Sequence, residues 1–198
     1  RVALGELYIG AVEVGVGLIP GAGGNLRLIL NLMENFGTGG RINTFQITQK
    51  AFETIGFAKV ATSAKEAQGI GYLQKDDRII INRDHILSEA KDEVLKMSDN
   101  YIVPEVESFK LPGKSGRLVL EGTLKGFVKS GKISEHDALI GRKLGNVLTG
   151  GEKGGPFTAV DEQYLLDIER EAFISLCGEQ KSIDRIEYML KRGKPLRN

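Results

Sequence analysis

The chain is poor in cysteine and histidine. Its 198 residues include one cysteine, Cys177, and two histidines, His85 and His136. A single cysteine cannot form an intrachain disulfide, and these three side chains cannot supply the four ligands of a Cys/His zinc site. A low cysteine content is typical of a reducing compartment, and it predicts a cytoplasmic protein. Because a Cys/His zinc site is excluded, we also expect no metal.

A strong charge of either sign and a long apolar run are also absent. The 27 lysines and arginines nearly balance the 26 aspartates and glutamates, which gives a net charge of +1. This balance excludes a protein that binds nucleic acid through bulk charge. No apolar run reaches the roughly 18 residues that a membrane helix needs. We therefore expect neither nucleic acid nor a membrane as a partner. Because the sequence begins at Arg1 without an initiator methionine or a signal peptide, we expect a processed protein or a piece of a longer one.

Glycine, by contrast, is abundant, with 26 residues, and it is concentrated between Gly15 and Gly24. A dinucleotide fingerprint that starts at Gly15 has Pro20 in place of its third glycine, and a phosphate-binding loop would need lysine where Asn25 follows Gly24. Both motifs are therefore excluded. A glycine turn that leads into a helix still presents free backbone N–H groups, which suit an anion or a polarised carbonyl. A plain turn between a strand and a helix fits the same spacing, and this alternative stays open.

The periodicity predicts a mainly α (α+β) protein, with short N-terminal strands followed by a helical bundle. Strands are expected within residues 2–18 and at 78–81. Capping boxes and glycine stops delimit the expected helices, which cover residues 25–36, 43–56, 63–70, 84–97, 116–129, 134–148, 161–177 and 182–192. His136 is expected at the surface or in a helix cap, and Cys177 in the core near a helix end.

Glu13 is the candidate catalytic residue, because it lies in an apolar stretch just before the glycine turn. A carboxylate flanked by buried residues loses hydration, and this environment suits acid–base chemistry. The alternation of side chains along a strand would also allow Glu13 to face solvent, which is the alternative interpretation.

Residues 8–24 resemble the signature of the crotonase (enoyl-CoA hydratase/isomerase) superfamily, in which a glutamate lies seven residues before the proline of a P-G-x-G-G turn. Glu13 and Pro20 have this spacing. Residues 61–71 resemble, in a shortened form, the S-A-x-E-A helix of the same family. Residues 162–198 are similar to the C-terminus of a narrower group, the prokaryotic fused enzymes of fatty-acid β-oxidation. These carry an NAD-dependent 3-hydroxyacyl-CoA dehydrogenase followed by a crotonase-like hydratase.

The resemblance implies the C-terminal part of a crotonase-like fold that hydrates or isomerises a 2-enoyl-CoA thioester. It makes Glu13 catalytic, and it assigns substrate binding to Pro20, Gly21, Gly23 and Gly24. It implies no cofactor in this segment, with NAD bound in a separate dehydrogenase domain. The family's other glutamate and its oxyanion donors would precede Arg1, so we expect the fragment alone to be inactive.

The resemblance and the distribution of proline and glycine suggest three regions. Residues 1–100 would form the C-terminal part of the crotonase-like core, 101–116 a linker, and 117–198 a helical cap or assembly region. Since crotonases assemble through C-terminal helices, the resemblance also implies a homo-oligomer, with the acyl-CoA substrate as the small-molecule partner. The alternative is a helical interaction or oligomerisation module without chemistry.

Overall fold

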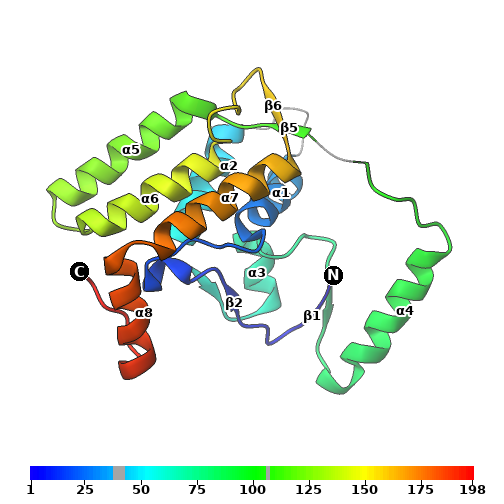
Figure 1. Cartoon of the computed structure of the whole chain (residues 1–198). Helices are drawn as coiled ribbons and strands as arrows, with labels where there is room; N and C mark the ends of the chain where they lie inside the picture. The colour runs from blue at the N-terminus through cyan, green and yellow to red at the C-terminus, as the bar shows by residue number, and fades with distance from the viewer. Residues whose placement is uncertain (38–42, 106–107) are drawn as a thin grey trace.

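The computed structural model describes residues 1–37, 43–105 and 108–198, and it is mainly helical, with few short strands (Figure 1). The prediction of a mainly α chain is confirmed, and the predicted helices are present with their ends shifted by a few residues at most. The crotonase-like fold stays a prediction. The helices are α1 (Gly24–Phe36), α2 (Thr44–Gly56), α3 (Ala64–Ile70), α4 (Ile86–Ser98), α5 (Gly113–Lys129), α6 (Glu135–Leu148), α7 (Glu162–Cys177) and α8 (Gln180–Arg192).

The side chains of N-cap residues determine where several helices begin. Asn43 accepts a hydrogen bond from the backbone N–H of Gln46 at the start of α2. Ser134 and Asp137 form a reciprocal capping box at the start of α6. These bonds satisfy N–H groups that have no partner within the helix, which is why the helix starts could be predicted from the sequence.

In the described part of the chain, the strands form three separate pairs. β1 (Val2–Leu4) runs parallel to β4 (Arg78–Ile80), with Ala3 opposite Ile79. β2 (Ile9–Gly10) is antiparallel to β3 (Val60–Ala61), and β5 (Ser108–Lys110) is antiparallel to β6 (Ala159–Asp161). β5 and the first turn of α5 lie within the predicted linker, of which residues 106–107 lie outside the described residues.

The expected strand over residues 12–18 is wrong, because this segment forms the 3₁₀ turn η1 (Glu13–Val16). The N–H of Gly15 donates to the carbonyl oxygen of Val12 over 2.9 Å, and the N–H of Gly17 to that of Val14 over 3.2 Å. Gly17 then ends the turn in the left-handed region, at φ 87°. Glycine adopts this conformation without the steric cost of a Cβ, so local hydrogen bonds replace strand pairing here.

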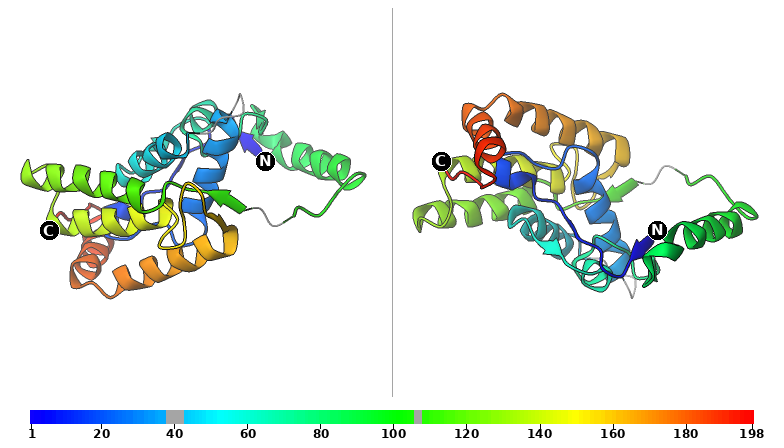
Figure 2. Two further views of the ribbon diagram at one scale, coloured as in Figure 1. Left: turned by 90° about the horizontal axis from the view of Figure 1, so that it is seen from above. Right: turned by 90° about the horizontal axis from the view of Figure 1, so that it is seen from below.

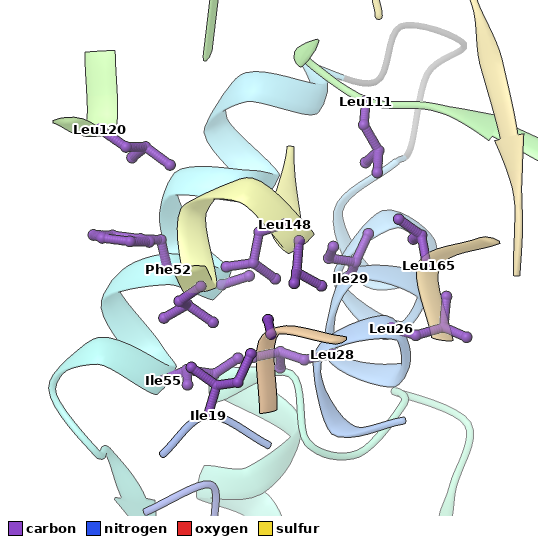
Figure 3. Packing of buried hydrophobic residues seen from close by; sticks show 14 of the residues in the cluster. Ile19, Leu26, Leu28, Ile29, Phe52, Ile55, Leu111, Leu120, Leu148 and Leu165 are labelled. Atoms are coloured by element: carbon purple, nitrogen blue, oxygen red, sulfur yellow. The ribbon is translucent and has the colours of Figure 1, made fainter. Parts of the chain in front are cut away.

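One apolar core joins helices from both ends of the chain. Residues of α1, α2, α5, α6 and α7 share this cluster, which also includes Ile19 just before the glycine turn. Ile19 lies beside Ile55 of α2 and Leu28 of α1 (Figure 3). The core thus includes residues from both sides of the predicted linker, 101–116. It also places the glycine turn against the C-terminal helices. The three-region division stays a prediction.

The helix α4 lies apart from this core. It extends away from the other helices in all three views (Figures 1 and 2), and none of its residues is buried. η2 (Arg83–His85) precedes it, and residues 99–105 follow it without regular structure. We refer to residues 83–105 as the α4 arm.

Candidate active site

Glu13 is the first residue of η1, and one oxygen of its carboxylate is buried without a partner. The Oε2 atom of Glu13 has less than 1 Å² of accessible surface and makes no hydrogen bond within the part of the chain that the structure describes. Buried polar atoms in proteins are nearly always hydrogen-bonded, since an unmade bond costs about 1–3 kcal/mol. A carboxylate oxygen left in this state has unused hydrogen-bond capacity, which a water molecule or a substrate can reach only if the surrounding side chains move aside.

Tyr72 fixes the chain just before Glu13. Its hydroxyl accepts a hydrogen bond from the N–H of Ala11 over 3.0 Å and donates one to the carbonyl oxygen of Lys59 over 2.8 Å. Burial raises the pKa of Tyr72, and the negative charge of Glu13 adds to this rise against the opposing bond from Ala11. Tyr72 therefore keeps its proton and continues to link the segment before η1 to Lys59, which lies between α2 and β3.

The glycine turn receives a carboxylate from within the protein. Glu169 of α7 is buried, and its Oε1 accepts the N–H of Gly23 over 2.6 Å. Its Oε2 accepts the backbone N–H of Asn25 over 3.2 Å and the side-chain Nδ2 of Asn25 over 2.8 Å. A negative group at a helix N-terminus is stabilised both by these donors and by the helix dipole.

Because Glu169 takes these donors, the expectation of free N–H groups at the turn is wrong for Gly23. The structure places the protein's own carboxylate where an external anion was expected. Substrate binding by Pro20, Gly21, Gly23 and Gly24 stays a prediction. Because the Gly23 N–H is already bonded to Glu169, the turn would contribute to such binding through its shape and not through this donor.

Sequence reasoning missed Glu169, although a signal was present. Glu169 falls on the same face of α7 as Leu165, Ala172 and Leu176, which are all buried. A carboxylate at an apolar position of a helix needs internal donors when it is buried. The apolar face was recognised, but the glutamate within it was not.

The turn is packed so closely that two of its glycines leave no space for a side chain. A Cβ atom on Gly21 would lie 2.6 Å from the ring of Phe173, in α7. A Cβ atom on Gly17 would lie 2.9 Å from the Cα of Ser182, in α8. The carbonyl oxygen of Gly17 accepts a hydrogen bond from the Ser182 hydroxyl over 2.7 Å. α7 and α8 therefore support the segment that carries Glu13.

His136 stands behind Ser182, with its Nε2 3.0 Å from the Ser182 Oγ. Since the Ser182 hydroxyl gives its proton to Gly17, the hydrogen-bond network assigns Nε2–H of His136 as the donor to Ser182. Burial lowers the pKa of His136, and the cations of Arg185 and Lys181 lower it further. The expectation of a surface or capping histidine is wrong, because His136 is buried and neutral.

Arg185 closes this side of the site with an ion pair in which the Arg185 side chain is buried and that of Asp137 is half-buried. Its guanidinium donates to the Asp137 Oδ1 over 2.7 Å and to the Asn198 Oδ1 over 2.8 Å. Although burial opposes it, the bonds from Ser134 and Arg185 hold the pKa of Asp137 below its usual value.

The predicted core position of Cys177 is also wrong, since Cys177 is exposed beyond the packed face of α7.

The described residues show neither a metal cluster nor a membrane span. Within residues 1–37, 43–105 and 108–198, no group of three or more His, Cys, Asp or Glu side chains is placed to hold a metal ion. In the same part of the chain, no helix has the length and apolar character to cross a membrane.

Comparison with known proteins gives one informative match. No family model matches the chain. A probable 3-hydroxyacyl-CoA dehydrogenase of Bacillus subtilis (strain 168) is 46% identical over 198 residues, which is 99% of this chain. The chain spans 24% of the length of that protein. The match supports a relation to a probable 3-hydroxyacyl-CoA dehydrogenase, and it does not show a fused hydratase.

Proposed function

We propose that this chain is part of a cytoplasmic fatty-acid β-oxidation enzyme and supplies the catalytic carboxylate for hydration of a 2-enoyl-CoA. The name of the Bacillus relative supports a parent that also oxidises the resulting 3-hydroxyacyl-CoA, with NAD bound outside this chain. Self-association of the parent stays a prediction.

The partnerless oxygen of Glu13 is the observation that carries this proposal. Hydration adds the hydroxyl of a water molecule to C3 of the enoyl thioester and a proton to C2. A carboxylate beside the double bond accepts a proton from the water molecule while the oxygen of that water forms a bond to C3. The carboxylate then returns a proton to C2. An oxygen that has no internal hydrogen bond is suited to hold that water once the side chains around it move aside to admit it.

The surroundings of Glu13 support a catalytic role over a helical interaction module. Tyr72 fixes the chain before Glu13, and Ser182 and Glu169 fix the chain after it. A module that only binds other proteins has no need to hold a buried carboxylate in this way. The cost of the unmade hydrogen bond is instead typical of a functional site.

The substitution Glu13→Gln in the complete natural protein tests the proposal. We expect hydration of crotonyl-CoA to fall by at least about 100-fold, since acid–base groups contribute about 10²–10⁴ in rate. NAD-linked oxidation of 3-hydroxybutyryl-CoA should remain close to that of the wild type. The first rate is followed by loss of enoyl-thioester absorbance and the second by formation of NADH.

Glu6→Gln is the matched control, because Glu6 is exposed and lies shortly before Glu13. It should leave both rates unchanged. Equal loss of both rates in Glu13→Gln would make Glu13 a structural residue, and unchanged hydration would overturn the proposal.

A further inference from the structure

The α4 arm presents an apolar face that nothing in the described part of the chain covers. Leu87, Val94 and Met97 are all exposed. Their spacing along the helix places them, together with Ala90, on one side of α4. Three more exposed apolar side chains follow the helix, Tyr101, Ile102 and Val103. Figure 2 shows that the arm stands clear of the other helices.

A helix with such a face needs more support than the arm receives from the residues that the structure describes. α4 has 13 residues, and an isolated helix of this length is only marginally stable in water. Arg78 pairs with Glu89 and Glu93, but these two carboxylates lie on the polar side of α4, away from Leu87. Contiguous apolar patches on protein surfaces are typical of interaction sites. We therefore expect a partner to cover the apolar face.

Arg1 lies at the base of the arm. Its amino group donates to the Oδ1 of Asp77 over 2.7 Å, and its carbonyl oxygen accepts the N–H of Arg78 over 2.9 Å. Arg78 in turn pairs with Glu89 of α4, and β1 lies against α4. Both views of Figure 2 place the N-terminus beside the arm. In a longer polypeptide, the residues before Arg1 would therefore start next to α4.

A preceding segment needs few residues to follow the arm. The helical rise gives α4 a length of about 20 Å. An extended chain advances about 3.3–3.6 Å per residue, so roughly six residues before Arg1 reach along the whole helix. The Bacillus relative is about four times as long as this chain. A parent of that size has ample polypeptide outside residues 1–198 to cover the arm.

The small area of the face favours a tethered segment over a separate molecule. A stripe about 20 Å long and about 10 Å wide has an area of roughly 200 Å². Each side of a stable, specific interface buries about 800 Å², and the three apolar side chains after α4 do not close this gap. A segment of the same polypeptide needs less contact area, because a short tether gives it an effective concentration in the millimolar range.

We propose that the apolar face of the α4 arm packs against a segment of the same polypeptide that precedes Arg1 in the complete protein. The partner segment is amphipathic, with its apolar side on Leu87 and Val94 and its polar side toward solvent. The inference rests on the proposed function only because that proposal makes this chain part of a longer enzyme, and it does not depend on Glu13. Residues 1–198 alone leave the face exposed.

Photo-cross-linking in the complete protein tests the inference. One variant carries p-benzoylphenylalanine in place of Leu87, and on irradiation this residue bonds covalently to C–H groups that touch it. We expect a cross-link within one polypeptide, which mass spectrometry identifies as joining the α4 peptide to a peptide that precedes Arg1. Lys96 is the matched control position, because it is exposed and lies about two and a half turns from Leu87, on the opposite side of α4. The same residue in place of Lys96 should form no such cross-link.

Val94, on the same side of α4, serves as the second position if the variant at Leu87 does not fold. A cross-linked product of two copies would assign the face to a second copy, and a product with another protein would assign it to a separate partner. Either result would overturn the inference, as would equal cross-linking from Leu87 and Lys96 or none from Leu87. The cross-link should also form in Glu13→Gln. If it forms in a wild type that does not hydrate crotonyl-CoA, the proposed function alone is overturned.

Discussion

The helical body and the α4 arm have similar sequence patterns but opposite environments. α6 buries an apolar face that includes Ile140, Leu144 and Val147. α4 has a comparable amphipathic pattern, yet Leu87 is 80% exposed and Leu95 is 55% exposed. The comparison teaches that periodicity predicts a helix and its apolar face, whereas it does not predict what covers that face.

The two regions are also held by different interactions. The body combines apolar contacts with buried hydrogen bonds such as those of Glu169. The arm is tied to the strand pair by Arg78, which pairs with Glu89 and Glu93 of α4. Partly exposed ion pairs of this kind are worth about 0–1 kcal/mol. We therefore expect the body and the arm to respond very differently to the same type of substitution.

The largest difference should come from paired leucine-to-alanine substitutions. Leu144→Ala removes a fully buried side chain of the core and should lower the free energy of unfolding by about 2–5 kcal/mol. Leu95→Ala, in the exposed face of α4, should change it by no more than about 0.5 kcal/mol. Urea unfolding followed by circular dichroism measures both values. A loss above 2 kcal/mol for Leu95→Ala would show that the arm is packed in solution.

A pair of glutamate-to-glutamine substitutions should have a smaller effect. Glu169→Gln replaces an acceptor of three hydrogen bonds by a group that has one acceptor oxygen, and should cost about 1–3 kcal/mol. Glu93→Gln weakens only the partly exposed ion pairs that Glu93 makes with Arg78 and Lys96, with a cost of about 0–1 kcal/mol. The same unfolding assay applies. Equal costs would mean that the carboxylate of Glu169 does not stabilise the glycine turn.

The smallest effect should be a pH dependence that belongs to the body. The pKa of His136 is lower in the folded protein than in the unfolded chain, so the unfolded chain binds more protons at mildly acidic pH. The resulting stability is fully present above about pH 6.5 and is lost as the pH falls below it. His136→Gln should flatten the fall in unfolding free energy between about pH 7 and pH 5.

His85→Gln, in the exposed η2 turn of the arm, controls for the loss of an imidazole as such. The low-pKa aspartates Asp77 and Asp137 lose their contribution only at more acidic pH, so they do not obscure this window. An unchanged slope in His136→Gln would contradict the assignment of a buried neutral histidine.

Local signals explain which parts of the fold could be predicted from the sequence. The caps at Asn43 and Ser134 act within one turn of a helix, so the residues that form them are close in the sequence. The strand predicted over residues 12–18 was wrong because its apolar residues also suit a short 3₁₀ turn, and the glycines decide between the two. β6 was missed because three residues give too short a pattern to recognise.

The candidate site was predictable only in part, because its partners are distant in the sequence. Glu13 and the turn were found from their spacing. Glu169, Ser182 and His136 were not assigned to the site, since the glycine turn meets them only through the packing of α6, α7 and α8. No local pattern indicates that a glutamate in α7 reaches a glycine almost 150 residues earlier.

This separation has a consequence for the order in which the protein is made. Glu169 and Ser182 lie 146 and 165 residues after the glycines that they contact. A ribosome that adds about 5–20 residues per second exposes the turn several seconds before α7 and α8 exist. During this interval the nascent chain has a glycine turn without its internal carboxylate and a Glu13 segment without support from Ser182. The environment of Glu13 is therefore completed only after α7 and α8 have been made.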